Sequence, residues 1–231
     1  MVSRYKSKRL VSLSWSPNLA YAVGLITTDG CLSSDKRHIT FTSNDLEQIR
    51  NIKLIMKIND KIGITSNERG ESFRITFSNV QIYDWLIGIG LMPHKSLIMK
   101  EIAIPDEYFV DFLRGHLDGD GSITTYIDHY NSIKNPTYVY KRIFVRFISA
   151  SEKHILWLHG KIKKILGVHG AVHKSKVMSG KNPMYIIKFA KKESLILLSK
   201  IYYSDTIPCL SRKKIKYENF INNIEPKTCY D

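Results

Sequence analysis

An apolar segment that ends in Asp-Gly occurs twice along the chain. It reads AYAVGLITTDG over residues 20–30 and DFLRGHLDGDG over residues 111–121. The carboxylates at the two ends, Asp29 and Asp120, are 91 residues apart in a chain of 231. Apolar positions at helical spacing predict two buried helices. Their recurrence predicts a pseudo-twofold protein in which these helices pair at the centre and bring two carboxylates together.

Small residues support the pairing of these helices. Each helix carries two of them four positions apart, at Gly24 and Thr28 and at Gly115 and Gly119. Small residues at this spacing let two helix backbones approach closely. A glycine inside a helix costs about 1 kcal/mol relative to alanine, so its presence at matching positions indicates a packing need. We expect Gly30 and Gly121 to end the helices with positive φ angles.

The same order of elements follows in each half. In the first half we expect a helix over 17–28, strands over 31–33 and 38–43, a helix over 45–58, strands over 63–66 and 72–78, and a helix over 80–90. In the second half we expect a helix over 105–119, strands over 122–128 and 138–149, a helix over 152–166, strands over 168–176 and 184–190, and a helix over 191–202. Asn18, Asn44 and Ser151 are the expected helix caps, and a last helix over 214–223 is expected to pack across the back.

This order predicts an α+β fold built of two αββαββα repeats with antiparallel sheets. We place the N-terminal repeat at residues 1–102, with a basic N-terminal arm, and the C-terminal repeat at residues 103–231, with a C-terminal helix. The first 15 residues, MVSRYKSKRLVSLSW, are basic and rich in serine. An arm that lies on DNA explains them, and a transit peptide is the alternative.

Charge and cysteine content narrow the class of partner and compartment. The chain has 35 Lys and Arg against 21 Asp and Glu, a net charge of +14, which favours a nucleic acid as partner. A basic protein without such a partner is the alternative. Cys31, Cys209 and Cys229 form no CxxC pair and suit a reducing, intracellular compartment, either a bacterial or archaeal cytoplasm or an organelle matrix. No run approaches the roughly 18 apolar residues of a membrane helix.

The predicted strands carry polar and basic residues on one face. A curved sheet with such a face fits the DNA major groove, which is about 12 Å wide and admits a two-stranded ribbon. The candidate DNA-binding residues are Arg37, Thr40, Thr42, Arg74, Thr76, Arg142, Arg146, Lys174, Lys176 and Lys188.

The helix ends are candidate metal ligands. A helix C-terminus carries about half a negative charge, so Asp29 and Asp120 there attract a cation, together with the carbonyls of Thr28 or Gly119. Mg²⁺ needs few protein ligands and keeps water or phosphate oxygens as the others. The sequence DGDGS at 118–122 also resembles the start of an EF-hand loop, but His129 stands where that loop needs its last carboxylate.

The segments AVGLITTDG at 22–30 and LRGHLDGDG at 113–121 resemble the two signature motifs of LAGLIDADG homing endonucleases. FTSNDLEQI at 41–49, LMPHKSL at 91–97 and SRKKIKYENF at 211–220 extend the resemblance over most of the chain. Two motifs in one chain resemble the monomeric, pseudo-symmetric subgroup. The resemblance implies β-saddles that bind a long, asymmetric double-stranded DNA site, and cleavage of both strands across the minor groove that leaves 3′ overhangs. It also implies dependence on Mg²⁺ or Mn²⁺, with Ca²⁺ binding without cleavage.

The resemblance also assigns roles to single residues. It implies that Asp29 and Asp120 are the catalytic, metal-binding acids and that the Thr28 and Gly119 carbonyls assist them. Thr27 replaces the first aspartate of the first motif, a modest departure.

A basic residue beside each acid is implied as well. Lys95 and Lys213 match this role best, with Lys100 and Lys214 as competitors. Asn44 matches a polar position that orients solvent. Its counterpart in the second half is Ala150, which makes the two half-sites unequal.

Two functions stay open at this point. The first is a site-specific endonuclease. The second is a protein of the same fold that binds DNA or RNA without cleavage, either a transcription regulator or a maturase with intron RNA as a partner. The acids at both helix ends favour the enzyme, because a pure binder gains nothing from carboxylates that face phosphates.

Overall fold

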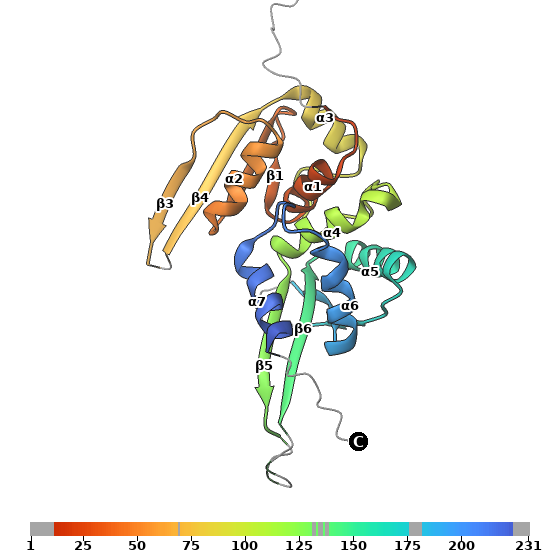
Figure 1. Ribbon diagram of the computed structural model, residues 1–231. Helices are drawn as coiled ribbons and strands as arrows, with labels where there is room; N and C mark the ends of the chain where they lie inside the picture. Colours follow the sequence, from red (N-terminus) through yellow and green to blue (C-terminus); the bar gives the residue numbers. More distant parts are fainter. Residues whose placement is uncertain are drawn as a thin grey trace, which may run out of the picture.

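The computed structural model describes residues 12–223 except 69, 131, 132, 134, 135, 137, 138 and 176–181. Figure 1 shows a pair of central helices with a sheet on either side of them. The predicted N-terminal arm and Lys176 lie outside the described residues, apart from the last few positions of the arm. Among the helices that are described, none is both long and apolar enough to cross a membrane.

Each repeat forms one antiparallel sheet, and the two sheets have the same topology. The strands are β1 (Gly30–Leu32), β2 (His38–Ser43), β3 (Gly63–Asn67), β4 (Gly70–Ser78), β5 (Ser122–Asp128), β6 (Tyr140–Ser149), β7 (Ala171–Lys174) and β8 (Tyr185–Phe189). The strand orders are β1-β2-β4-β3 and β5-β6-β8-β7. The predicted α+β class and two-repeat fold are therefore confirmed.

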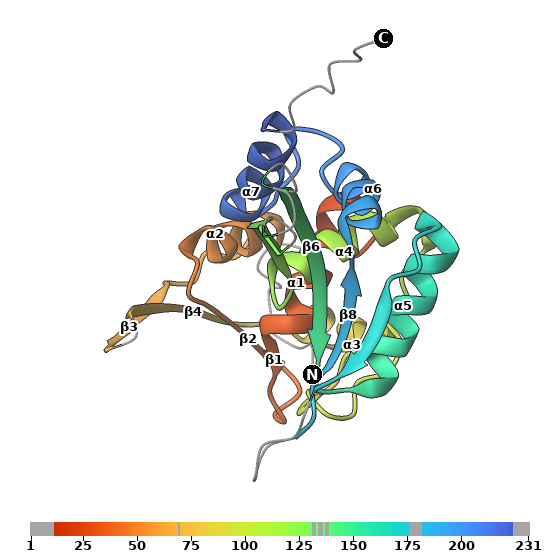
Figure 2. The same cartoon turned by 90° about the horizontal axis from the view of Figure 1, so that it is seen from below.

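Helices cover one face of each sheet. They are α1 (Pro17–Asp29), α2 (Leu46–Ile55), α3 (Val80–Gly88), α4 (Phe109–Asp118), α5 (Glu152–Leu166), α6 (Lys191–Ile201) and α7 (Ser211–Asn222), with a 3-10 turn, η1 (Asp106–Tyr108), before α4. α5 runs along the second sheet (Figure 2). Alternate strand residues such as Ile39, Phe41, Val145 and Phe147 are fully buried against the helices, as a sheet with one solvated face requires.

α1 and α4 pack along each other through the predicted glycines. A Cβ atom on Gly24 would lie 2.2 Å from the Phe112 carbonyl oxygen, and one on Gly115 would lie 2.1 Å from the Tyr21 carbonyl oxygen. No larger residue fits at either position without separating the two backbones. The helix pair at the pseudo-twofold axis is the centre of the molecule.

The prediction that Gly30 and Gly121 have positive φ angles is wrong. Gly30 has φ −85°, and Gly121 is not among the glycines with positive φ. Each glycine is instead needed for space. A Cβ atom on Gly30 would lie 2.5 Å from the Ile26 carbonyl oxygen, and one on Gly121 would lie 2.7 Å from the Leu117 carbonyl oxygen.

Two predicted helix caps are also wrong. α1 is capped by Ser16, whose Oγ accepts a hydrogen bond from the Leu19 N–H. The N-cap position of α2 is Asp45 rather than Asn44, and the Asp45 side chain makes no capping hydrogen bond. Ser151 caps α5 as predicted. Backbone position, rather than residue preference, decides among neighbouring polar residues.

The last helix begins earlier than predicted. α7 starts at Ser211 and packs beside β5 (Figure 1). Its first turn therefore includes Lys213 and reaches the ends of the central helices. The chain passes between the repeats through residues 91–105, where the Ala103 N–H donates to the Ile89 carbonyl.

Candidate active site

The ends of α1 and α4 bring the two predicted acids together. Asp29 is the last residue of α1, and Asp120 follows the Gly119 cap of α4. Gly119 lies directly against the other helix, since a Cβ atom on it would be 1.9 Å from Thr28 Oγ1 and 2.8 Å from Asp29 Oδ2. Thr28 and Gly119, the two residues whose carbonyls are the other predicted ligands, are therefore in contact.

The charged form of Asp29 is disfavoured at this site. Burial, and after it the nearby Asp120 carboxylate, raise the pKa of Asp29 to about 7. Burial also raises the pKa of Asp120, although the Lys95 and Lys213 ammonium groups lower it. Two neighbouring acids of like charge are stabilised by a cation between them. The residues present therefore fit a divalent metal ion.

Lys95 and Lys213 are buried beside these acids, each on the carbonyls that end one helix. The Lys95 Nζ donates to the Gly30 carbonyl. The Lys213 Nζ donates to the carbonyls of Leu117 (2.6 Å), Asp118 (2.7 Å), Gly121 (2.7 Å) and, at 3.2 Å, Gly119. Burial lowers the pKa of Lys213 to about 8, against the attraction of Asp118. The lysines thus add positive charge at both helix ends.

The competing lysines are not at the site. Lys100 is exposed. The Lys214 Nζ pairs with Asp205 at 2.6 Å and with Glu218 at 3.5 Å. The structure therefore brings Lys95 and Lys213, rather than their neighbours, to the acids.

Asn44 lies exposed in the bend before α2, whereas Gln48 is buried at the site. The Gln48 Nε2 donates to the Asp118 carbonyl at 2.5 Å, and its Oε1 accepts from Ser43 Oγ at 2.6 Å. Sequence reasoning missed Gln48 because its partner is in the other repeat. A usable signal was its match to the buried His154 when FTSNDLEQI is aligned with the second repeat.

Asp118 is a buried carboxylate that supports the end of α4. Its Oδ2 accepts from Tyr21 Oη (3.0 Å) and from the Leu210 N–H (2.7 Å). Burial raises its pKa to about 6. Its counterpart Thr27 donates to the Val23 carbonyl of its own helix at 2.7 Å. Among the described residues, no group of three or more His, Cys, Asp or Glu side chains could hold a metal, so any metal here would rely on the two acids, carbonyls and non-protein ligands.

Most predicted DNA-binding residues do share the solvent-facing sides of the sheets. In the first sheet Thr40 pairs with Thr76 and Thr42 with Arg74. In the second sheet Arg146 pairs with Lys188, and Arg142 points the same way, opposite Tyr126. Directly opposed residues in an antiparallel pair lie on the same face.

Two predicted contacts do not lie on these faces. Lys174 pairs with the buried Tyr185, over whose ring its Nζ lies at 5.5 Å, so the prediction that it shares the face of Lys188 is wrong. His173 occupies that place instead, because a shift of one residue moves a strand's side chains to the other face. Arg37 precedes β2 and lies 3.6 Å from Asp35.

The solvent-facing sides begin at the acids. β1 starts immediately after Asp29 and β5 two residues after Asp120. Each sheet therefore extends away from the helix ends, and a duplex on both sheets would pass over the two carboxylates.

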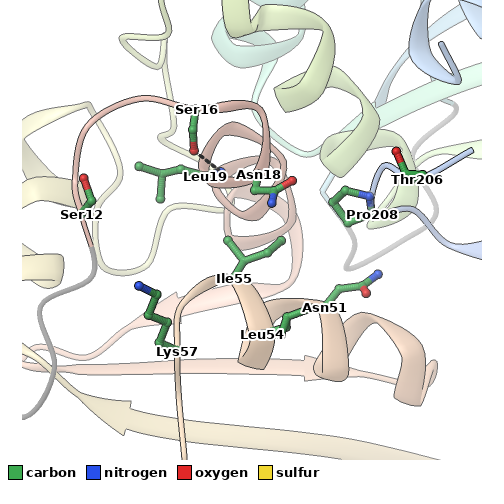
Figure 3. A pocket seen from close by; sticks show the side chains of 10 residues that line it. All are labelled: Ser12, Ser16, Asn18, Leu19, Asn51, Leu54, Ile55, Lys57, Thr206 and Pro208. Atoms are coloured by element: carbon green, nitrogen blue, oxygen red, sulfur yellow. Dashed lines mark hydrogen bonds between the residues drawn. The ribbon is translucent and has the colours of Figure 1, made fainter. Parts of the chain in front are cut away.

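A pocket of about 520 Å³ lies elsewhere, at the start of α1 (Figure 3). Ser16, Asn51, Lys57 and Pro208 are among the residues that line it. Since α1 has 13 residues and rises about 1.5 Å per residue, the pocket is about 20 Å from Asp29. It is not part of the acid site.

Solved structures with this arrangement are found among LAGLIDADG proteins. The I-SmaMI LAGLIDADG homing endonuclease bound to cleaved DNA matches with a TM-score of 0.59 and 12% identity, over 90% of this chain and 88% of that one. The I-LtrWI LAGLIDADG homing endonuclease bound to target DNA matches with a TM-score of 0.56 and 12% identity, over 89% of each chain.

Full-length DUF199/WhiA from Thermatoga maritima matches with a TM-score of 0.53 and 18% identity. The match covers 92% of this chain but only 63% of that protein. No protein-family model matches the chain, and no curated protein matches it. The structural matches, together with the paired helices that end in Asp29 and Asp120, show that the chain has the LAGLIDADG fold.

Proposed function

We propose that the chain is a site-specific DNA endonuclease that cleaves both strands of a duplex and depends on a divalent metal ion. The observation that carries this proposal is the convergence of Asp29 and Asp120, each near a buried lysine, at the root of two sheets with polar and basic outer faces. The fold alone does not decide the activity. It occurs in proteins named homing endonucleases and also in DUF199/WhiA, which is not named an endonuclease.

The metal would be held by the Asp29 and Asp120 carboxylates with the Thr28 and Gly119 carbonyls. When bound, Mg²⁺ or Mn²⁺ would stabilise the charge on the attacking and leaving oxygens of phosphodiester hydrolysis, and Ca²⁺ would bind without supporting cleavage. The carboxylates must be deprotonated to serve as ligands.

The chain's own residues would supply positive charge at the site and orient the duplex. Lys95 and Lys213 hold positive charge beside the acids, where the phosphate of the cut strand would lie. The sheet faces orient the duplex through residues such as Arg74, Arg146 and Lys188. Because the two faces differ in sequence, the target is asymmetric, and two active centres on one monomeric chain would cut the two strands with 3′ overhangs.

A binding protein without cleavage is the less favoured alternative. Two carboxylates close to a phosphate backbone weaken DNA binding unless a metal neutralises them. Their retention at both helix ends therefore supports cleavage, whereas neither DNA binding alone nor intron RNA binding accounts for them.

The test begins with a random duplex library incubated with the protein and Mg²⁺, from which cleaved sites are selected. Asp120→Asn should abolish cleavage of the selected site while metal-free DNA binding is largely retained. Asp29→Asn should shift the product towards nicked DNA. Asp84→Asn, an exposed aspartate on α3, is the control and should cut like the parent protein. Full activity of Asp120→Asn, or no cleavage of any site by the parent protein, would overturn the proposal.

A further inference from the structure

The turn that carries Lys213 is held by the other repeat. From this contact we infer that Asp45 and Glu47, in the first repeat, are positioning residues that set Lys213 at the end of α4 in the second repeat. The inference rests on the proposed function for its meaning, but the contacts themselves do not depend on it.

The contacts are made by the two residues immediately before Lys213. Arg212 forms a two-pronged ion pair with Asp45, with Nε 2.8 Å from Oδ1 and Nη2 2.7 Å from Oδ2. Ser211 donates to Glu47 from its N–H (2.9 Å) and from its Oγ (2.5 Å). Such paired charge-assisted bonds fix orientation as well as distance.

This anchoring determines where the Lys213 ammonium group can lie. The first turn of α7 is fixed on one side by α2, and the Nζ reaches four carbonyls around the end of α4 on the other side. Lys213 is 4% exposed. A rotation of this turn would therefore withdraw the ammonium group from the site.

A reciprocal but weaker arrangement holds the turn of Lys95. Ser151, which caps α5 in the second repeat, donates from its Oγ to the Met99 carbonyl at 2.5 Å. His154 Nδ1 lies 2.7 Å from the Lys100 carbonyl. The Met99 N–H donates in turn to the Lys95 carbonyl at 2.8 Å. Each lysine is thus anchored by the opposite repeat, through charged groups in one case and neutral groups in the other.

A general role in joining the repeats predicts a different outcome from a positioning role. Loss of a general contact would lower stability and slow cleavage of both strands alike. Loss of a positioning contact would slow only the strand that depends on Lys213 and would lower kcat more than it raises KM.

The experiment compares Asp45→Arg, Arg212→Asp and the double variant that restores the pair in reverse. Cleavage of each strand is measured on a duplex labelled at both ends. We expect Asp45→Arg to slow the same strand as Lys213→Met, by about 10-fold to 100-fold, as when a reacting group is misplaced by about 1 Å. The double variant should recover most of the lost rate. Asp106→Arg, which breaks the ion pairs of Asp106 with Lys161 and Lys164, is the matched control and should leave the strand ratio unchanged.

A second measurement does not need activity. Amine acylation followed by mass spectrometry should show Lys213 labelled severalfold faster in Asp45→Arg than in the parent protein, with Lys95 unchanged. If the parent protein cuts no DNA, the proposed function fails, and this labelling still decides the anchoring. Unchanged labelling of Lys213, equal gains at both lysines, or equal slowing of both strands would overturn the inference.

Discussion

At the end of α1, the Thr27 hydroxyl turns back onto its own helix and donates to the Val23 carbonyl. At the same place in α4, Asp118 accepts hydrogen bonds from Tyr21 of the other repeat and from Leu210 of the C-terminal segment. One threonine therefore closes its helix locally, whereas one carboxylate joins three segments. Two repeats with the same backbone plan can therefore support their acids with different amounts of surrounding structure.

The largest effect should come from the feature that both repeats share. We expect Gly24→Ala and Gly115→Ala each to lower the free energy of unfolding by about 3 kcal/mol or more, because the new methyl group would meet backbone of the partner helix. Gly160→Ala in α5 is the control, since nothing lies within 4 Å of its Cβ position, and it should stabilise by about 0.5–1 kcal/mol. Denaturant unfolding measures all three. Equal behaviour of the three variants would disprove the close helix contact.

The two repeats should contribute differently to the pH dependence of the free energy of unfolding. In the second repeat His116 and His154 are buried with their Nε2 atoms 3.1 Å apart, where the first repeat has Leu25 and Gln48. Burial lowers the pKa of His154 to about 4 and the pKa of His116 as well.

Below about pH 6.5 the unfolded chain therefore binds more protons than the folded chain at these histidines. Stability from the neutral pair is present above pH 6.5 and is lost as the pH falls towards 4, by about 3 kcal/mol for His154 alone. The double variant His116→Leu/His154→Gln should lack this loss. The test is the difference in free energy of unfolding between the two proteins from pH 7.5 to 4, in which titration of the shared acids cancels. A constant difference would contradict the buried neutral pair.

The smallest effect concerns the faces of the second sheet. Lys188 lies on the solvent-facing side with its Nζ 4.2 Å from the centre of the Phe144 ring, whereas Lys174 lies on the opposite side. Lys188→Ala should reduce the slope of log binding constant against log salt by about 0.9, the value for one phosphate contact, and Lys174→Ala should leave it unchanged. DNA binding over a salt series measures both. An equal reduction of this slope in the two variants would contradict the assignment of DNA contact to the solvent-facing side.

The sequence predicted the helix pair because the pattern that produces the pairing lies within each helix segment. Gly24 and Gly115 stand at matching positions of a repeated apolar pattern, and that pattern requires a partner helix. Lys95 and Lys213 were found by resemblance to a known family and lie beside the acids. In contrast, Lys174 was placed on the wrong face because strand register is set by its partner strand, which periodicity alone does not fix.

Residues whose partners are far along the chain could not be predicted. Gln48 is buried only because α4 of the other repeat supplies the Asp118 carbonyl. The anchoring of Arg212 by Asp45 likewise joins residues that no local pattern connects. The sequence therefore predicts elements and candidate chemistry, and three-dimensional packing selects among neighbouring polar residues.

The contact between α1 and α4 has a consequence for the newly made chain. Every side chain of α1 from Leu19 to Thr27 is buried in the finished protein, yet α4 is synthesised much later. Until α4 emerges from the ribosome, α1 exposes apolar surface of the kind that chaperones bind. Asp29 is synthesised before Asp120 and Lys213 after both, so the proposed cutting activity cannot be assembled until Lys213 has left the ribosome.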